Sequence, residues 1–357
     1  VVTARDRMRL ASRTLAAGVP YVGADFRFDP VPFAPFEVPS IAVIGSGKRV
    51  GKTAVAGHVA RLLAEEREVV VVAMGRGGPR EPVVVEEPPD VDDLLERARA
   101  GSHAASDYLE DAALARVVTI GCRRCGGGLA GNPFVSNVEA GARAAAERQP
   151  DLVVFEGSGS ALPPVETAAR VLVTGGSQDP GLVAGYLGAY RILLSDLVIL
   201  TGCEEPLVRR EDVERLREAI AEVKDVPVVA TVFRQRPVGP VDGRKVALFS
   251  TAPEEIHDRI RRHLEDVHGA EVVLVSGNLS KRDRLRRELD SREAEEAEVY
   301  LVEIKAAAIE VVAEAASERG KDVVFAENAV LPLEGEPDVD EALRRLADAA
   351  MRERTRT

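Results

Sequence analysis

Residues 45–53 read Gly45-Ser-Gly-Lys-Arg-Val-Gly-Lys-Thr53, between an apolar run at 41–44 and an amphipathic stretch at 54–66. Glycines in such a loop let backbone N–H groups turn inward around phosphate oxygens, while a lysine reaches the β- and γ-phosphates and a Thr hydroxyl holds Mg²⁺. Lys52 and Thr53 are placed for these two roles. The common pattern has glycine six residues before the lysine, where this chain has Ser46. The spacing predicts a nucleotide-binding phosphate loop; a glycine-rich turn with a fortuitous Lys-Thr pair is the alternative.

The nucleotide site is expected to include most of this loop and one residue far from it. Arg234 follows a strand at 226–232, where folds of this kind often meet the base of the nucleotide, so it is a candidate for contact with adenine. The residues expected to bind the nucleotide are Gly45, Ser46, Gly47, Lys48, Val50, Gly51, Lys52, Thr53 and Arg234.

Around the loop, short apolar runs alternate with helical patterns. The runs are continuous and do not alternate with polar residues, which is typical of parallel strands that helices cover on both faces. They lie at 41–44, 68–73, 115–120, 151–155, 170–174, 196–200 and 226–232, and four more follow at 245–249, 271–276, 298–303 and 322–326. The sequence predicts an α/β fold: a P-loop NTPase domain with a mostly parallel sheet, and a second, smaller α/β domain at the C-terminus.

Proline-rich segments suggest where the domains divide. Residues 29–39 contain four prolines, which suit neither a helix interior nor a central strand, and prolines 237 and 240 mark a second boundary. We expect residues 1–39 to be a remnant of an N-terminal segment with a linker, because the chain starts at Val1. Residues 40–240 are then the ATP-binding domain, and residues 241–357 the small C-terminal domain.

Composition excludes several classes of partner. The 357 residues include 47 basic and 59 acidic side chains, a net charge of −12, whereas general nucleic-acid and membrane-surface binders carry the opposite sign. No apolar run approaches the roughly 20 residues of a membrane span. Three cysteines cannot build a disulfide scaffold in a chain this long, which indicates the reducing cytoplasm. We therefore expect a cytoplasmic enzyme that binds neither nucleic acid nor membrane.

Two carboxylates are candidate metal ligands beside the Thr53 hydroxyl. Glu156 ends the apolar strand 151–155, the position from which phosphate-loop folds bring an acid to nucleotide-bound Mg²⁺. Asp107, at the start of a helical stretch, is the second candidate. Each has a structural alternative, because a strand-end or first-turn carboxylate also stabilises a helix N-terminus.

Arginines gather on two glycine-rich loops in a protein that is acidic overall. Strand 68–73 leads into Gly75-Arg-Gly-Gly-Pro-Arg80, and strand 115–120 into Gly121-Cys-Arg-Arg-Cys-Gly-Gly-Gly128. Ligands of open parallel sheets bind beyond the strand carboxyl ends, and guanidinium groups match phosphate oxygens two at a time. A second polyanion is therefore expected, although solvated loop arginines are the alternative. Its candidate ligands are Arg76, Arg80, Arg123, Arg124, Gly126, Gly127, Ser158 and Gly159, and the candidate catalytic residues are Lys52, Arg76, Arg123 and Arg124.

The pair Cys122 and Cys125 has the spacing of a half zinc site or a redox dithiol. A structural zinc ion needs two further ligands, and Cys203 is the remaining cysteine. Small residues packed under the loop are the simpler interpretation, and the alternatives stay open.

The loop at 45–53, with Glu156-Gly-Ser-Gly159, resembles dethiobiotin synthetase over residues 40–235. Over nearly the whole chain, Tyr21-Val-Gly-Ala-Asp-Phe26, the run at 121–128 and Ala230-Thr-Val-Phe-Arg234 resemble the cyclic 2,3-diphosphoglycerate synthetases. This resemblance implies that ATP closes an intramolecular phosphoanhydride in 2,3-bisphosphoglycerate and leaves as ADP and phosphate. The expected cofactors are ATP and Mg²⁺, with K⁺ as a further candidate, and a homodimer is expected. A 2-phosphoglycerate kinase and a partner-regulated P-loop ATPase are the alternatives.

Overall fold

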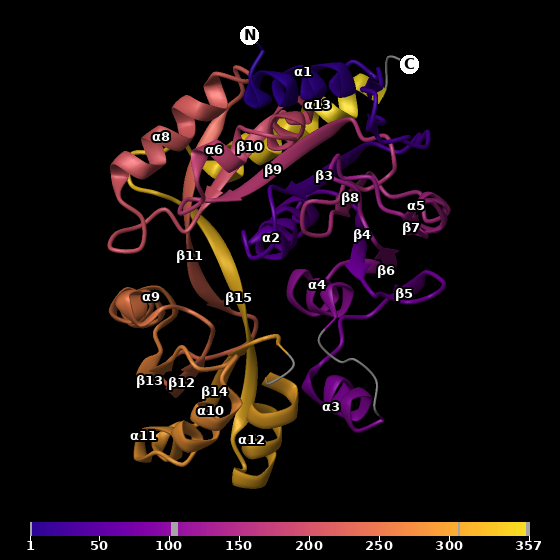
Figure 1. Ribbon diagram of the computed structural model, residues 1–357. Helices are drawn as coiled ribbons and strands as arrows, with labels where there is room; N and C mark the ends of the chain where they lie inside the picture. Colours follow the sequence, from indigo (N-terminus) through magenta and orange to yellow (C-terminus); the bar gives the residue numbers. More distant parts are fainter. Residues whose placement is uncertain (1, 101–105, 306–307, 355–357) are drawn as a thin grey trace. The chain divides into compact units, whose positions relative to one another are not determined.

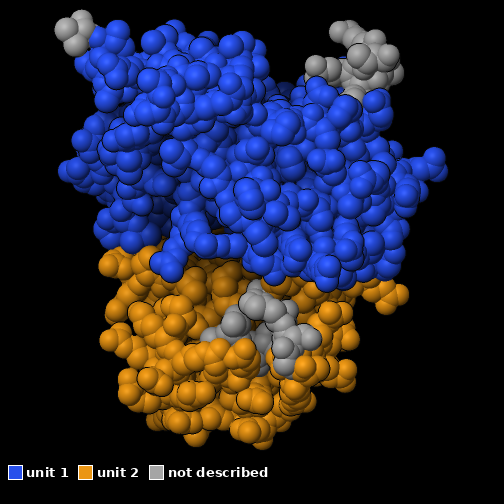
Figure 2. All heavy atoms as spheres, turned by 45° about the vertical axis from the view of Figure 1, so that its right-hand side comes forward, with its two compact units in different colours: residues 1–86, 117–232, 330–357 blue, residues 87–116, 233–329 orange. Residues whose placement is uncertain are grey.

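The computed structural model describes residues 2–100, 106–305 and 308–354. The chain forms two compact units, coloured separately in Figure 2. Unit 1 comprises residues 1–86, 117–232 and 330–357, and unit 2 comprises residues 87–116 and 233–329. Both are of the α/β class, as the sequence predicts. Among the described residues no helix is long and apolar enough to cross a membrane.

Unit 1 is built on a largely parallel sheet with the strand order β11-β10-β9-β3-β8-β4-β6-β5 (Figure 1). The strands are β3 (Ser40–Gly45), β4 (Val69–Arg76), β5 (Val83–Val85), β6 (Val118–Cys125), β8 (Leu152–Glu156), β9 (Ala169–Gly175), β10 (Leu197–Thr201) and β11 (Val228–Pro237). β5 and the short β7 (Val135–Ser136) are antiparallel to β6. Every residue of β3, β8 and β10 is buried, which confirms the interpretation of continuous apolar runs as central strands.

The helices of unit 1 follow the strands and cover the sheet. They are α1 (Ala4–Ala16), α2 (Lys52–Ala64), α5 (Val138–Ala146), α6 (Pro180–Val183), α7 (Gly188–Leu194), α8 (Arg210–Ala221) and α13 (Val339–Arg354). Alternate strand residues such as Ala42, Val72 and Phe155 are buried in one large core cluster together with Val138 and Ala142 of α5. The crossover helix α2 buries Val55 and Val59.

Residues 1–39 are part of unit 1. A capping box of Thr3 and Asp6 starts α1, which packs on α7. Phe36, from the proline-rich stretch, is buried and meets Phe155 of β8 edge to face, with ring centroids 5.2 Å apart. The stretch expected to be a linker is therefore held by its apolar side chains, which fill the core between the prolines.

The C-terminal helix also belongs to unit 1, whereas the sequence analysis assigns residues 241–357 to one domain. α13 buries Leu343, Ala347 and Ala350 and packs on α2, β3 and β9. Arg67 and Asp348 form an ion pair of 2.6 Å beside this contact. The physical reason is that the apolar stripe of α13 needs a sheet to cover. The helical pattern in the sequence shows this stripe but not which sheet it packs on.

Unit 2 has a four-stranded parallel sheet in the order β13-β12-β14-β15. The strands are β12 (Lys245–Phe249), β13 (Glu271–Ser276), β14 (Val299–Glu303) and β15 (Asp322–Pro332). The helices are α3 (Val91–Arg99), α4 (Asp107–Ala115), α9 (His257–His268), α10 (Arg282–Leu289), α11 (Arg292–Glu296) and α12 (Glu314–Arg319), with a 3₁₀ turn at Glu254–Ile256 and a π-helical turn at Ala308–Ala313. The helices α3 and α4 come from residues 87–116, inside the range expected for the ATP-binding domain. α3 packs instead on the π-helical turn of unit 2.

Candidate active site

The loop at 45–53 joins β3 to α2, as the sequence predicts. Gly51 is the N-cap of α2 and has a φ of +76°, a left-handed conformation that favours glycine, so Lys52 is the first residue of the helix. The backbone N–H of Ser46 donates to Val173 O of β9 at 2.9 Å. The buried hydroxyl of Thr201, at the end of β10, donates to Val50 O at 2.8 Å. The loop is therefore tied to two strands beyond its own, and pattern reasoning missed the Thr201 contact.

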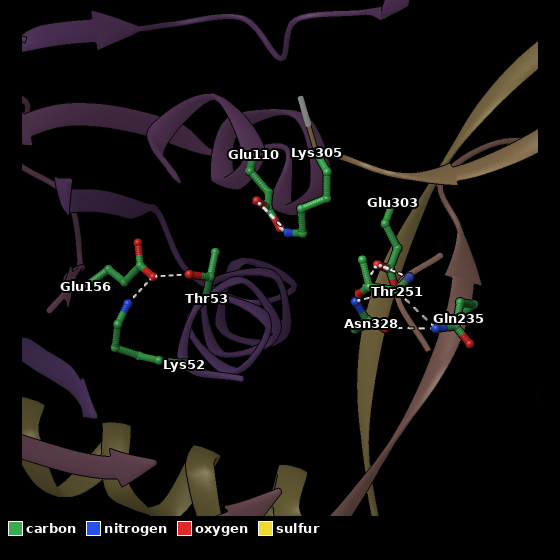
Figure 3. Close-up of polar contacts among 9 residues, drawn as sticks. All are labelled: Lys52, Thr53, Glu110, Glu156, Gln235, Thr251, Glu303, Lys305 and Asn328. Carbon is green, nitrogen blue, oxygen red and sulfur yellow. Dashed lines mark hydrogen bonds and ion pairs between the residues drawn. The ribbon is translucent and has the colours of Figure 1, made fainter. Parts of the chain in front are cut away.

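Lys52, Thr53 and Glu156 meet at the start of α2 (Figure 3). Lys52 Nζ donates to Glu156 Oε1, and Thr53 Oγ1 donates to the same oxygen at 2.7 Å. Lys52 is 7% exposed and Glu156 0%. Glu156 Oε2 is buried without a hydrogen-bond partner among the described residues. Because β8 pairs with β3 in parallel, the carboxylate at the end of β8 lies beside the loop that leaves β3.

Arg76 and Arg124 are paired by the register of β4 and β6. They are Cα partners in this parallel ladder, so their side chains start from the same face of the sheet. Burial and the neighbouring charge of Arg76 lower the pKa of the Arg124 guanidinium. Arg124 has no carboxylate partner in the described part of the chain; it donates to Gly126 O at 2.7 Å and to Ser158 O at 3.0 Å. Two like charges side by side without a counterion favour an anion between them.

Arg123 lies on the other face of the sheet. Successive residues of a strand alternate between faces, and Arg123 is two residues beyond Gly121. Gly121 is in register with Ala73, and Ala73 with Glu156. Arg123 therefore lies on the same face of the sheet as Glu156, whereas Arg124 lies on the opposite face. The strand β6 extends to Cys125, although the sequence analysis places a loop from residue 121. The physical reason is the ladder with β4, which pairs these polar residues and which no local pattern shows.

The segment after β8 brings the phosphate loop to the arginine pair. Gly159 has a φ of +60°, and a Cβ there would lie 3.5 Å from Lys48 Cγ and 3.6 Å from Arg124 Nη2. A Cβ on Gly45 would lie 2.7 Å from Gly159 O, so glycine is required where the two loops touch. Gly127 is as close to Arg124, with 3.5 Å from the built Cβ to Nη1. Next to it, an open hollow of about 520 Å³ is lined by Gly127, Gly128, Asn132, Pro133 and Phe134.

Asn137 and Arg191 hold these loops in place, and the sequence analysis missed both. Asn137 Oδ1 accepts from Arg123 N at 2.7 Å, while its Nδ2 donates to Pro79 O and Arg80 O at 3.1 Å each. One amide thus ties the two arginine loops together. Arg191, 4% exposed, donates to Ser160 O at 2.6 and 2.9 Å, and burial lowers its pKa to about 10. These contacts join segments that are far apart in the sequence, so only the three-dimensional structure shows them.

Arg80, Asp107 and Arg234 are also expected at the site. Arg80 is exposed. Asp107 starts α4 in unit 2, where its charge, with those of Glu110 and Glu303, raises the pKa of Lys305 against the opposing effect of burial. Arg234 also belongs to unit 2 and donates to Phe233 O at 2.7 Å. Their roles toward metal, substrate and adenine stay predictions.

The cysteine pair faces two different environments. Cys122 is fully buried, and burial raises the pKa of its thiol to about 12, whereas Cys125 is exposed. An odd separation along β6 starts their side chains on opposite faces. No group of three or more His, Cys, Asp or Glu side chains is placed to hold a metal within the described ranges. Packing under the loop accounts for Cys122.

Fold and loop together define a P-loop nucleotide-binding protein with arginines close to its loop. The family model described as cyclic 2,3-diphosphoglycerate synthetase, P-loop domain, matches residues 40–232, and the model of the C-terminal domain of the same synthetase matches residues 237–329. The chain belongs to the cyclic 2,3-diphosphoglycerate synthetase family, which confirms the resemblance. The first match ends at residue 232, just before unit 2 resumes at residue 233, and the second ends at residue 329, where unit 2 ends.

Two curated relatives illustrate the match. The cyclic 2,3-diphosphoglycerate synthetase of Rubrobacter xylanophilus is 54% identical over 361 residues, covering 99% of this chain and 80% of the relative. That of Methanothermus fervidus is 42% identical over 358 residues, covering 98% of this chain and 78% of the relative. Among solved structures, LpxK from Aquifex aeolicus in complex with ATP covers 89% of this chain and 90% of its own, with 14% identity and a TM-score of 0.49. That score is too low to support an argument.

Proposed function

We propose that this enzyme uses ATP to form the intramolecular phosphoanhydride of cyclic 2,3-diphosphoglycerate from 2,3-bisphosphoglycerate, releasing ADP and phosphate. The observation that carries the proposal is the position of Gly159. It lies between Lys48 of the phosphate loop and Arg124, one of two neighbouring arginines. A nucleotide held by the loop and a polyanion held by the arginines are then neighbours. Membership of the cyclic 2,3-diphosphoglycerate synthetase family supports the same assignment.

The reaction is a phosphoryl transfer followed by an internal displacement. One substrate phosphate oxygen attacks the γ-phosphorus of ATP, and the bond to the β,γ-bridging oxygen breaks to release ADP. An oxygen of the second substrate phosphate then attacks the newly activated phosphorus, forms the ring anhydride and expels inorganic phosphate. Catalysis is mostly alignment and charge neutralisation. Lys52 offsets charge on the transferred phosphoryl group, and Arg76, Arg123 and Arg124 offset charge on the substrate.

The residues beside the loop fit Mg²⁺. The buried Glu156 Oε2 has no hydrogen-bond partner among the described residues, and the Thr53 hydroxyl lies 2.7 Å from the other carboxylate oxygen. Hard oxygen ligands and few protein contacts are what Mg²⁺ uses at nucleotide sites. Bound there, the ion would neutralise charge on the outer phosphates. Asp107 as a further ligand, Arg234 at adenine and K⁺ as a second cation rest on the sequence analysis alone.

Analysis of products by phosphorus NMR tests the function. Incubation with ATP, Mg²⁺ and 2,3-bisphosphoglycerate should produce a cyclic pyrophosphate signal with stoichiometric ADP and phosphate. A new monoester signal from 2-phosphoglycerate alone would instead establish a kinase. ATP hydrolysis that depends on a protein partner and not on a small anion would establish a regulated ATPase.

A homodimer in the cytoplasm is the assembly we propose. Phe134 is 87% exposed and Leu129 72%, on the segment that follows the arginine loop. Contiguous exposed apolar surface marks interaction sites. Three unpaired cysteines suit a reducing compartment. Light scattering on the eluting protein decides between a dimer, which we expect, and a monomer.

A further inference from the structure

Gln178 follows the end of β9, and its amide is held in one orientation. Its Oε1 accepts from Ser46 Oγ at 2.5 Å, from the Thr174 hydroxyl, and from the backbone N–H of Gly175 at 3.3 Å. A backbone N–H can only donate, so the atom of Gln178 that faces Gly175 is the oxygen. The side-chain –NH₂ group must therefore lie on the other side of the amide. Three donors thus fix the direction of an amide that is otherwise free to turn.

The –NH₂ group of Gln178 faces the phosphate loop. A Cβ built on Gly47 would lie 3.6 Å from Gln178 Nε2, in van der Waals contact. Nε2 has no acceptor within hydrogen-bond distance among the described residues. Gly47 lies five residues before Lys52, the residue that reaches the β- and γ-phosphates in loops of this pattern. The neighbours of β3 are β8 and β9, so Glu156 and Gln178 approach the loop from its two sides.

The hydrogen bond from Ser46 to Gln178 gives the Ser46 side chain a role. In the common loop pattern this position is glycine, which has no side chain to hold a neighbour. Here the hydroxyl donates to Gln178, and it lies 2.9 Å from the Thr174 hydroxyl. The departure of the loop from the common pattern is therefore coupled to Gln178, in the segment that follows the neighbouring strand β9.

We propose that Gln178 Nε2 donates to an oxygen of the terminal phosphate of the nucleoside triphosphate held by residues 45–53. The proposal rests on the nucleotide binding included in the proposed function. A donor aimed at the terminal phosphate favours the triphosphate over the diphosphate, because ADP lacks the accepting group. It also helps the enzyme to release ADP once the γ-phosphoryl group has left.

Gln178→Glu is the test variant, and Gln149→Glu is its matched control. The glutamate keeps the size of the side chain and can accept the same three hydrogen bonds, but it replaces the donor with an acceptor. Gln149 is exposed after α5, so its substitution changes the net charge equally without touching the loop. Isothermal titration with ATP and with ADP, both with Mg²⁺, should show a Kd for ATP at least tenfold higher in Gln178→Glu, which corresponds to about 1.4 kcal/mol. The Kd for ADP should stay within twofold, and the control should match the wild type for both.

Each remaining outcome decides between the two proposals. Unchanged ATP affinity in Gln178→Glu, or an equal loss for ATP and ADP, would overturn the role of Gln178. Gln178→Met keeps the length without donor or charge, and it replaces the glutamate variant if that variant has a lowered unfolding midpoint. A selective loss of ATP affinity in the methionine variant supports the proposal, and unchanged affinity overturns it. Wild-type protein that binds neither nucleotide would instead overturn the proposed function.

Discussion

Replacing Lys52 with alanine tests the buried ion pair beneath the phosphate loop. Sequence reasoning predicts that turnover is lost and the fold is unaffected, because a loop lysine acts on phosphates. In the structure, however, Lys52 is 7% exposed and pairs with a Glu156 that is 0% exposed. Alanine leaves that carboxylate buried without its counter-charge, and breaking a buried pair from one side costs about 3–5 kcal/mol. We therefore expect Lys52→Ala to lower the free energy of unfolding of the nucleotide-free protein by about this amount, in addition to abolishing turnover.

The double variant Lys52→Ala/Glu156→Gln separates the charge from other effects of the substitution. A neutral glutamine can still accept from Thr53 Oγ1, which lies 2.7 Å from the oxygen that it replaces. We expect the double variant to recover most of the stability that Lys52→Ala loses. Together with Glu156→Gln, the variants form a double-mutant cycle that isolates the interaction between the two residues.

Urea unfolding without nucleotide or Mg²⁺, followed by circular dichroism, measures these free energies by linear extrapolation. Two results would refute the reasoning. One is a Lys52→Ala protein within about 0.5 kcal/mol of the wild type, the usual range for surface substitutions. The other is a double variant no more stable than the single one, since the unpaired charge would then not be the cause.

Three further predictions concern the arginine loops and the cysteines. Arg123→Ala/Arg124→Ala should raise the KM for 2,3-bisphosphoglycerate on the order of a hundredfold or more, because each charge-assisted bond contributes ~1.5–3 kcal/mol. The KM for ATP should stay unchanged, and equal rises in both would mean that the loop shapes the nucleotide site. Asn137→Ala should raise the KM for 2,3-bisphosphoglycerate by about fivefold or more, since each lost hydrogen bond contributes ~1 kcal/mol. Asn137→Asp, which still accepts from Arg123 N, should recover part of this loss, and a change in kcat alone would contradict the prediction. Iodoacetamide at pH 8 should label the exposed Cys125 and spare Cys122, because burial raises the pKa of the Cys122 thiol to about 12 and keeps it protonated there; equal labelling by peptide mass spectrometry would contradict this.

The sequence predicts the central strands and the phosphate loop well, because both depend on local patterns. The run at 41–44 lies within β3, and Lys52 begins α2 where the motif requires. The extension of β6 through Arg123 and Arg124 was not predictable in this way. Arginine and glycine have little preference for strands, and only the ladder with β4 keeps residues 121–125 extended.

Assignment of segments to units was the least predictable part of the fold. The helix α13 and residues 87–116 both have amphipathic patterns, and such a pattern states that a face is buried without stating against what. The same limit applies to the site. Gln178 and Asn137 are common polar residues outside any motif, and their roles depend on neighbours that lie on other strands.

The two cationic groups of the site differ in how their charge is balanced. Lys52 already has the carboxylate of Glu156 as its partner. When a nucleotide binds with its metal ion, the phosphates replace Glu156 as the partner of Lys52, and the metal ion becomes the partner of Glu156. Arg76 and Arg124 have each other as neighbours, and the repulsion lowers the pKa of Arg124 in addition to the effect of burial. A polyanion relieves that repulsion, whereas a nucleotide at the loop alone does not. The arginine pair is thus suited to a substrate whose own phosphates repel each other, because each set of like charges is neutralised by the other when they meet.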